Sequence, residues 1–277
     1  MTYDVATVTV NYKMRDKILA MLRSLYQDVA GSTLSVQPVI VDNASGDGLA
    51  EAIEREFHDV HPKPIVLAAG ANVGFSCGNN LALRRFDARY YFIANPDLLF
   101  LRDQPRTIER AVTFLDAHPE VGILAPRLMR PDGNVQPSCM RFPSFIDHPI
   151  YRLELHRKYR WARRRVDRLH MTDIDHCETR PVDWATGAAL VARGPWLREA
   201  GYFDERYFMY FEDCDLCRTF WARGWPVYYK GDIVVQHGHE RSSAKIPGLK
   251  SLLVNPLTRV HLKSLVQYSW KWKGRQP

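Results

Sequence analysis

The chain has 277 residues and a net charge of +7, with 46% hydrophobic and 12% aromatic residues, which is enough for one large core. No run reaches the roughly 18 consecutive apolar residues that span a bilayer, and the start, MTYDVATVTVNY, lacks the charged and apolar regions of a signal peptide. The composition therefore argues against a membrane-spanning protein, and we expect a cytoplasmic one.

The first 130 residues alternate short apolar runs with amphipathic segments. The apolar runs predict buried strands over residues 4–11, 36–43, 63–70, 89–97 and 121–126. The amphipathic segments predict helices over residues 15–27, 48–57, 79–86 and 106–117. This alternation predicts an α/β fold with a mostly parallel central sheet.

The second half of the chain continues this pattern. It predicts a strand at 187–192, a helix at 194–201, a helix through the acidic stretch after residue 208, and strands within 225–239. We therefore expect a single domain over residues 1–240 with a basic insertion at 150–172. A basic amphipathic helical tail follows over residues 241–277.

The positive charge is concentrated in two segments. Residues 152–168 hold eight Lys/Arg against two acids, and residues 241–277 hold eight Lys/Arg and no acid. Such segments suit an anionic partner: nucleic acid, phospholipid headgroups or a pyrophosphate-bearing substrate.

The tail mixes apolar residues with cations, which is typical of a helix lying on an anionic membrane surface. The alternative is a helix that packs its apolar face on the domain. The residues concerned are Val260, Leu262, Leu265, Val266, Trp270 and Trp272, among Lys263, Lys271, Lys273 and Arg275.

Polar residues stand where the predicted strands end. Asn11 ends the first strand, Asp42 and Asn43 end the second, and Asn95 and Asp97 end the fourth. Any one of them could be a turn residue. Since ligands of open α/β sheets bind outside the carboxyl ends of the strands, three such strands together favour a polar ligand at this edge.

The stretch FMYFEDCDLCRTF, residues 208–220, places Glu212, Asp213 and Asp215 among aromatic residues. Burying carboxylates costs free energy unless they are paired or bind cations, so the cluster predicts chemistry. The structural alternative is a buried ion-pair network. Asp215 is expected to cap the helix or to pair with Arg218.

Five cysteines occur, and two of them form a C-x-x-C pair, which suggests zinc or redox chemistry. A zinc site needs two further ligands, and no second pair is matched to this one. We therefore expect reduced thiols that pack in the core. The cysteines are Cys77, Cys139, Cys177, Cys214 and Cys217.

Neither G-x-G-x-x-G after a strand nor G-x-x-x-x-G-K-[ST] occurs in the chain. The charge of a bound nucleotide diphosphate must therefore be met in another way. A divalent cation, Mg²⁺ or Mn²⁺, held by a strand-end carboxylate would serve, and Asp97 fits that role.

Seven motifs together resemble inverting family-2 glycosyltransferases over roughly residues 4–240. They are VTVNY, VDNASGD, NVGFSCGNN, NPD, VDWATGAALVAR, GYFDERYFMYFEDCDLC and QHGH. Within that family the chain is most similar to bacterial rhamnosyltransferases of O-antigen and related cell-surface polysaccharides. The resemblance implies a GT-A-like fold and transfer of a sugar, often L-rhamnose from dTDP-L-rhamnose, to a lipid-pyrophosphate-linked acceptor.

The resemblance also implies a donor site. Asp42 would contact the nucleobase, and Asn72, Gly74 and Phe75 would lie along the nucleotide, with Asn11 added by the strand-end argument. Asp97 would hold the metal and the pyrophosphate, and Asn95 replaces the first acid of the usual D-x-D. Because an amide is a poorer metal ligand than a carboxylate, we expect modest metal affinity. His237 would complete the metal site, with His239 as the alternative ligand.

On the acceptor side, the resemblance implies that Asp183 and Trp184 line the sugar and acceptor site, although Trp184 could equally be a core residue. Asp213 would be the base that deprotonates the acceptor hydroxyl, and Glu212 would orient it by hydrogen bonding. The Q-x-x-R-W sequence of processive members is missing, which favours addition of one sugar.

Other functions fit the sequence less well. A UDP- or GDP-sugar could replace the dTDP-sugar. A sugar nucleotidyltransferase should carry a Gly-rich basic loop after the first strand, where VNYKMRDK stands instead. A nucleic-acid-binding protein would leave the acidic cluster unexplained, so we expect no nucleic-acid partner. We expect attachment to the inner face of the plasma membrane, where a lipid-linked acceptor resides.

Overall fold

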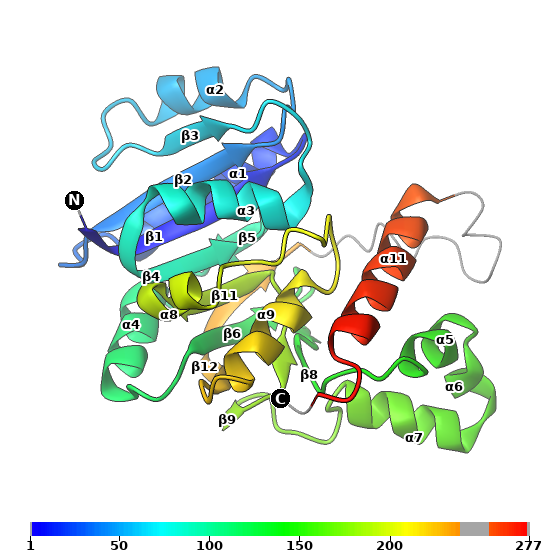
Figure 1. The fold of residues 1–277 in the computed structure, drawn as a ribbon. Helices are drawn as coiled ribbons and strands as arrows, with labels where there is room; N and C mark the ends of the chain where they lie inside the picture. The colour runs from blue at the N-terminus through cyan, green and yellow to red at the C-terminus, as the bar shows by residue number, and fades with distance from the viewer. Residues whose placement is uncertain (1, 239–254, 276–277) are drawn as a thin grey trace.

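The computed structural model describes residues 2–238 and 255–275. Its centre is a ten-stranded sheet, in which eight strands follow one another in the order β3-β2-β1-β4-β11-β6-β12-β5. Helices cover both faces of this sheet (Figure 1). The result is the mixed α/β fold, mostly parallel at its centre, that the sequence predicts.

The first half of the chain forms the parallel part of the sheet. Strands β1, β2, β3 and β4 alternate with helices α1, α2 and α3, and β1 lies between β2 and β4. Their bounds are β1 (Thr2–Asn11), α1 (Arg15–Asp28), β2 (Val36–Asp42), α2 (Leu49–Glu56), β3 (Ile65–Ala68), α3 (Gly74–Arg85) and β4 (Asp87–Ala94). In this register Asn11 pairs with Asp42, so the predicted strand-end residues do meet at one edge.

The second half adds strands of both directions. Strand β11 is antiparallel to β4 and β6, whereas β12 runs parallel to β6 and antiparallel to β5. The bounds are β5 (Leu98–Phe100), α4 (Thr107–Ala117), β6 (Ile123–Met129), β7 (Val135–Gln136), β9 (Thr179–Pro181), β11 (Ala189–Arg193), α8 (Gly194–Glu199), α9 (Glu212–Trp221) and β12 (Val227–His237). A separate pair of strands joins β8 (Cys139–Met140) to β10 (Trp184–Ala185).

The reversed direction of β11 matters for the site. Because β11 is antiparallel to β4, with Ala189 opposite Ala94, its first residues lie at the edge where β4 ends. The chain segment just before β11 therefore reaches the same edge as the strand-end residues of β1, β2 and β4.

Two hydrophobic cores hold these layers together. One lies between the sheet and helices α1, α2 and α4, and includes Leu22, Ile53 and Leu115. The other lies between the sheet and helices α3, α8 and α9, and includes Leu197 and Phe220. Helix α9, which carries the acidic cluster, is thus fixed on the second face by burial of apolar area.

Several elements differ from the sequence prediction, including the short strands β7, β8, β9 and β10, which it does not contain. Helix α3 begins at Gly74, five residues earlier than residue 79, because tertiary contacts outweigh the weak helix propensity of its glycines and serine. Strand β5 was not expected. The predicted strands within 225–239 form one strand, β12, whose pairing with β6 shifts register between Lys230 and Val234.

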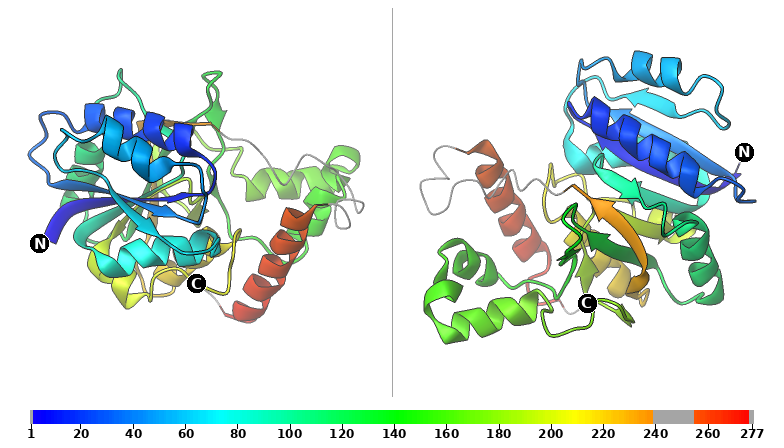
Figure 2. Two further views of the ribbon diagram at one scale, coloured as in Figure 1. Left: turned by 90° about the horizontal axis from the view of Figure 1, so that it is seen from above. Right: turned by 180° about the vertical axis from the view of Figure 1, so that it is seen from behind.

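A lobe stands beside the sheet domain. It consists of α5 (Asp147–Arg152), α6 (Leu155–Lys158), α7 (Arg160–Leu169) and α11 (Pro256–Lys271), which lie side by side in all three views (Figures 1 and 2). The predicted basic insertion is thus helical, and so is the described part of the predicted tail. Among the described helices, none combines the length and apolar character needed to cross a bilayer.

Helix α11 has one buried and one exposed side. Leu265, Tyr268 and Trp272 are buried, and the last two form a small core with Tyr207 and Cys214 of the sheet domain. This contact joins the lobe to α9 directly.

Candidate active site

The predicted donor residues of the first two strands form one hydrogen-bond network. The Asn11 amide nitrogen donates to Asp42 Oδ1 at 2.8 Å, to Ser45 Oγ at 3.0 Å and to Asp47 Oδ2 at 3.2 Å. Asn11 is fully buried, whereas Asp42 is only partly buried. The side chain of Asn11 therefore holds Asp42 in place, and Asp42 is the member of the pair that a ligand can reach.

A second network joins Asn43 to the predicted nucleotide motif. The Asn43 amide nitrogen donates to Gly74 O at 3.1 Å and to Asn72 Oδ1 at 3.3 Å, and Asn72 Oδ1 also accepts from Gly74 N–H at 3.2 Å. Asn43 Oδ1 is buried and has no hydrogen-bond partner among the described residues. The sequence identifies Asn43 as a strand-end residue, and the family resemblance assigns the nucleobase contact to its neighbour Asp42.

Gly74 and Phe75 meet the segment that leads into α9. The Phe75 N–H donates to Phe208 O at 2.7 Å. Gly74 has φ +82°, and a Cβ on it would lie 2.3 Å from Phe208 O. Only glycine fits here, because any side chain would collide with this carbonyl and strain the backbone.

Asn95, Asp97 and His237 come together at the ends of β4 and β12. His237 Nε2 lies 3.2 Å from Asp97 Oδ1 and 3.2 Å from the Asn95 amide nitrogen. His237 Nδ1 lies 3.0 Å from Gln136 Oε1. An amide oxygen can only accept, so we assign the ring proton to Nδ1, which turns the lone pair of Nε2 toward Asp97.

This arrangement fits a divalent cation. A nitrogen lone pair facing a carboxylate oxygen is unfavourable unless a cation or a second ring proton lies between them. Burial raises the pKa of Asp97, but when both ring nitrogens of His237 carry a proton, its hydrogen bond and charge outweigh the effect of burial and hold the pKa of Asp97 below its ordinary value. Gln136 would orient the histidine, as the outer hydrogen-bond partners of metal ligands do.

The described part of the chain supplies two candidate ligands of a coordination shell, Asp97 and His237. The described residues contain no group of three or more His, Cys, Asp or Glu side chains that could hold a metal. Asp97 and His237 would therefore need oxygens from the donor diphosphate and water to complete a shell. His239, the alternative ligand, lies outside the described residues.

The acidic cluster reaches the same edge through Gly187. The Gly187 N–H donates to Asp213 Oδ2 at 2.8 Å, and the next residue, Ala188, accepts from the Asn95 N–H at 2.9 Å. A Cβ on Gly187 would lie 3.4 Å from the Phe75 ring. One dipeptide thus links the predicted base, the predicted metal end and the predicted nucleotide motif.

Asp213 and Glu212 differ in how their surroundings shift their pKa values. Burial raises the pKa of Asp213, while hydrogen bonds from the Gly187 and Cys214 backbone oppose that rise. Burial and the charge of Asp213 raise the pKa of Glu212 well above its ordinary value. Glu212 Oε2 has no hydrogen-bond partner among the described residues. Asp213 is therefore the carboxylate of this pair suited to accept a proton at neutral pH, and Glu212 is suited to donate a hydrogen bond.

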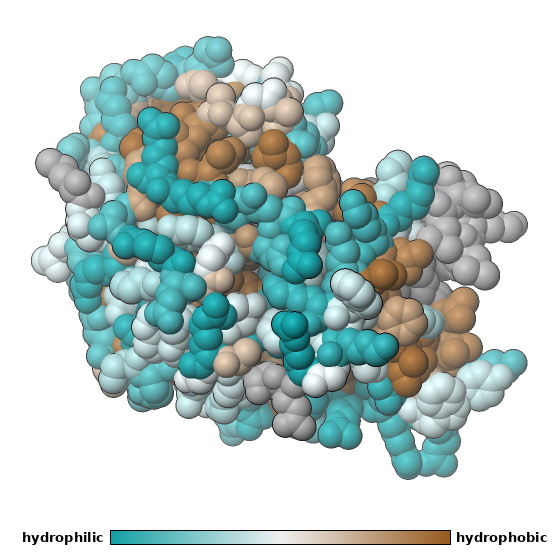
Figure 3. All heavy atoms as spheres, in the orientation of Figure 1, coloured by the Kyte–Doolittle hydropathy of each residue, from teal (hydrophilic) through white to brown (hydrophobic). Residues whose placement is uncertain are grey.

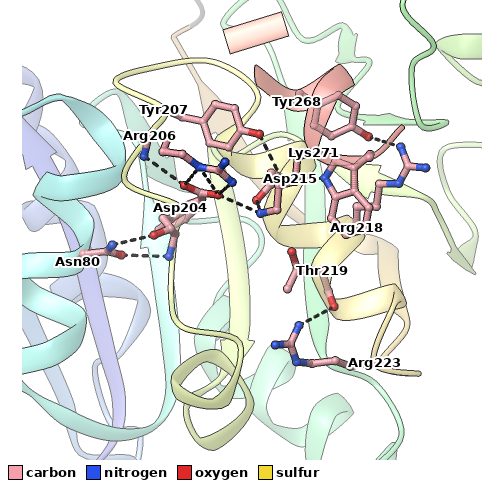
Figure 4. Close-up of polar contacts among 12 residues, drawn as sticks. Asn80, Asp204, Arg206, Tyr207, Asp215, Arg218, Thr219, Arg223, Tyr268 and Lys271 are labelled. Atoms are coloured by element: carbon pink, nitrogen blue, oxygen red, sulfur yellow. Dashed lines mark hydrogen bonds and ion pairs between the residues drawn. The ribbon is translucent and has the colours of Figure 1, made fainter. Parts of the chain in front are cut away.

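Asp215 contacts different groups from its neighbours Glu212 and Asp213. Its Oδ2 lies 2.6 Å from Lys271 Nζ (Figure 4), and its Oδ1 accepts from Trp272 Nε1 at 2.7 Å. The predicted pair with Arg218 is wrong, because Arg218 donates instead to the Tyr268 hydroxyl at 3.0 Å. Tertiary contact with α11 replaces the pairing within α9.

The predicted acceptor residues hold the segment that leads to Gly187. Asp183 Oδ2 accepts from Phe142 N–H at 2.8 Å, and Trp184 Nε1 donates to Arg141 O at 3.0 Å. Both side chains are partly buried, and Trp184 packs against two apolar clusters. Their backbone continues through β10 to Gly187, so they lie within four residues of the amide that holds Asp213.

The two cysteines of the C-x-x-C pair pack as expected. All five are free thiols, and burial raises the pKa of Cys214 well above its ordinary value and also raises that of Cys217. Both side chains are fully buried in apolar clusters. The C-x-x-C pair is therefore a packing feature of α9.

Solved structures with the same fold are glycosyltransferases. The mannosyltransferase PcManGT of Pyrobaculum calidifontis, solved with GDP-Man and Mn²⁺, superposes with a TM-score of 0.62 at 18% identity, covering 100% of this chain and 66% of that one. TarS 1-349 of S. aureus, solved with UDP-GlcNAc, superposes with a TM-score of 0.59 at 16% identity, covering 87% of this chain and 60% of that one. At these identities the likeness establishes the GT-A fold.

Sequence comparison establishes the family. Over 226 residues the chain is 30% identical to the N-acetylglucosaminyl-diphospho-decaprenol L-rhamnosyltransferase of Mycobacterium tuberculosis (strain H37Rv), covering 76% of this chain and 69% of that protein. It is 25% identical to the low-salt glycan biosynthesis hexosyltransferase Agl10 of Haloferax volcanii, covering 77% of this chain and 60% of that protein. Residues 4–177 match the model of Glycosyl transferase family 2. The chain belongs to this family and is a glycosyltransferase that resembles rhamnosyltransferases.

Proposed function

We propose that this glycosyltransferase transfers one sugar, with inversion, from a nucleotide-diphosphate donor to a hydroxyl group of a glycan acceptor. The observation that carries the proposal is the Gly187–Ala188 dipeptide. It binds the Asp213 carboxylate on one side and the Asn95 backbone on the other. A base and a diphosphate-binding end joined in this way are what a single displacement requires.

Asp213 acts as the general base in this proposal. Its Oδ1 and Oδ2 each accept one backbone N–H, from Cys214 and Gly187, at 2.8 Å. These bonds fix the carboxylate and favour its ionised form, against the effect of burial on its pKa. As the acceptor oxygen attacks the anomeric carbon, Asp213 takes its proton, and the bond to the donor diphosphate breaks on the opposite face. Glu212 donates a hydrogen bond to the acceptor sugar.

Asp97 and His237 would hold Mg²⁺ or Mn²⁺ at the diphosphate. When bound, such a cation neutralises the charge that develops on the leaving diphosphate. Asp42 would contact the nucleobase, held in place by Asn11. Asn72, Gly74 and Phe75 would line the nucleotide, and Asp183 and Trp184 the acceptor side.

The donor we propose is dTDP-L-rhamnose, with a lipid-diphosphate-linked glycan as the acceptor. Support comes from the Mycobacterium tuberculosis relative, whose name states an L-rhamnosyltransferase acting on N-acetylglucosaminyl-diphospho-decaprenol. UDP- and GDP-sugars are the alternatives, since the superposable TarS and PcManGT were solved with UDP-GlcNAc and GDP-Man.

A donor screen tests the proposal. Thermal shift with dTDP, UDP and GDP, each with and without Mn²⁺, should show the largest stabilisation with dTDP and Mn²⁺, because ligands that bind the native state raise its stability. Transfer to a polyprenyl-diphosphate-linked N-acetylglucosamine should then yield a product of the opposite anomeric configuration. Retention of configuration, or transfer from none of the donors, would refute the proposal.

The lobe supports a peripheral position on an anionic membrane, at the cytoplasmic face where a lipid-linked acceptor would be met. Leu262, Val266 and Trp270 of α11 are exposed by 41%, 51% and 81% and follow one another at a spacing of four residues, which aligns them on one side of the helix. Figure 3 shows apolar side chains gathered at this edge, over α11 and the neighbouring α5 and α6. Exposed patches of this kind mark interaction sites.

The structure revises which tail residues would meet a membrane. Leu265 and Trp272 are buried against the domain, so they cannot enter a bilayer as the sequence suggested. Lys271 is bound to Asp204 and Asp215. Lys263, Lys273 and Arg275 are exposed and remain as the cations for anionic headgroups. Lys273 and Arg275 line an open recess of about 540 Å³ beside Trp270.

A further inference from the structure

One lysine of α11 connects three separate parts of the molecule. Lys271 Nζ lies 2.6 Å from Asp215 Oδ2 and 3.0 Å from Asp204 Oδ2 (Figure 4). Asp215 stands in the first turn of α9, two residues after Asp213. Asp204 belongs to the segment that leads into α9. A single ammonium group thus bridges the C-terminal helix, the helix with the base, and the segment before it.

The segment between Asp204 and α9 also touches the predicted donor side. Phe208 O accepts the Phe75 N–H at 2.7 Å. At the start of the segment, the Asn80 side chain of α3 donates to Phe203 O at 2.8 Å and accepts from the Phe203 N–H at 3.1 Å. Any movement of this segment would therefore change both the entry of α9 and the contact at Phe75.

The carboxylates of Asp215 and Asp204 need a cation between them, and Lys271 supplies it. The side chain of Asp215 is 3% exposed and that of Asp204 is 17% exposed. Burial raises the pKa of Asp215, and the charge of Asp204 adds to that rise, while Lys271 opposes both. Among the described ion pairs, Asp204 has Arg206 as a second cation, but Asp215 has only Lys271. Removing one partner of a buried pair leaves an uncompensated charge, which is strongly destabilising.

We propose that Lys271 is a positioning residue for glycosyl transfer. By holding Asp215 and Asp204 together, it fixes the first turn of α9, and with it the Asp213 carboxylate against Gly187. It simultaneously fixes Phe208 against Phe75. Lys271 itself touches no reacting atom. The inference rests on the proposed role of Asp213 as the base, and it makes the docking of α11 a requirement for activity.

The test compares three variants with the wild-type chain. Lys271→Met removes the charge at similar length, Lys271→Arg keeps it, and the double variant Asp215→Asn with Lys271→Met removes both charges. Displacement of a catalytic group by about 1 Å can cost roughly 10²-fold in rate. We expect kcat to fall by about that factor in Lys271→Met, at a temperature well below its Tm and with the Kd for dTDP unchanged. Lys271→Arg should recover part of the rate.

The double variant separates positioning from stability. With no unpaired buried charge, it should recover Tm toward the wild-type value while kcat stays low, because the bridge to Asp204 is still missing. Arg198→Met in α8, which breaks an exposed ion pair with Asp87 at the start of β4, serves as the control and should leave kcat unchanged. If Lys271→Met or the double variant keeps wild-type kcat below its Tm, Lys271 only stabilises the fold and the inference is overturned. If the wild type transfers no sugar from any donor, the proposed function fails instead.

Discussion

At the scale of single residues, three neighbouring carboxylates in one turn of α9 differ in their hydrogen-bond partners. Asp213 receives two backbone N–H groups, Asp215 receives an ammonium and an indole N–H, and Glu212 Oε2 is left without a partner among the described residues. Hydrogen bonds to the charged form favour ionisation, and burial without them disfavours it. The amino-acid sequence alone does not show which hydrogen-bond partners each of these three acids has.

Replacement of Asp213 by Asn should abolish most of the transfer while the protein folds and binds nucleotide. Loss of a general base costs roughly 10²–10⁴ in rate, to be measured as kcat alongside dTDP binding by titration calorimetry. Glu212→Gln is the matched comparison. It should retain more activity, because its amide can donate the same hydrogen bond as the protonated acid. Near-wild-type turnover by Asp213→Asn would move the role of base to Glu212 or Asp215.

The metal assignment predicts that Asp97→Ala loses metal-dependent nucleotide binding altogether. Gln136→Leu should have a smaller effect, because Gln136 bonds to His237 and is not itself a proposed metal ligand. Loss of such an outer partner typically weakens metal affinity by about 10–100-fold. Binding of dTDP across a Mn²⁺ titration measures both effects. Full activity of the wild type in excess EDTA would contradict the assignment.

At the scale of elements, the N-terminus of α3 and the segment before α9 are fitted to each other at Gly74. The close approach of Phe208 O requires glycine at position 74. The packing of α3 against the segment before α9 therefore depends on this glycine, although the two elements are far apart in the sequence. The expected helix start at residue 79 was wrong for this reason. Local propensity disfavours a helix through these glycines, and the contact with Phe208 decides in its favour.

Gly74→Ala should therefore lower both the stability of the protein and its affinity for nucleotide. Gly133→Ala provides the control, since Gly133 has nearly the same φ, +80°, but no atom lies within 4 Å of the place that a Cβ would occupy there. Backbone strain of this kind costs about 1–3 kcal/mol, and both variants should show it in urea unfolding. Only Gly74→Ala should lose additional stability and dTDP binding. Equal effects in the two variants would show that the Phe208 contact can relax.

At the scale of the whole molecule, the lobe and the sheet domain are joined by α11. Its buried side packs with Tyr207 and Cys214, and its exposed side carries Leu262, Val266 and Trp270. Helix α11 therefore packs directly on the sheet domain, and its outer side is exposed.

The membrane proposal predicts that the wild-type chain sediments with anionic vesicles at low salt and is released at high salt, since salt screens exposed charges. Substituting Leu262, Val266 and Trp270 together by Ser should abolish sedimentation without unfolding, because all three are exposed. Leu81→Ser, at an exposed leucine of α3 (42%), is the control and should bind as the wild type does. A wild-type chain that stays in the supernatant under all conditions would assign the lobe to a protein partner or to the acceptor diphosphate.

The sequence by itself determined the fold class, the family and the strand-end edge, because these depend on local periodicity and on short motifs that contact one another along parallel strands. It also predicted that Cys214 and Cys217 are free thiols packed in the core, which the structure bears out, whereas Asp213 as the base is still a prediction. Tertiary structure decided what the sequence could not. The reversed strand β11 brings Gly187 to Asp213, the buried Gln136 faces His237, and Lys271 rather than Arg218 pairs with Asp215. Each of these contacts joins residues far apart in the chain, and burial and hydrogen bonding between distant segments leave no pattern in the local sequence.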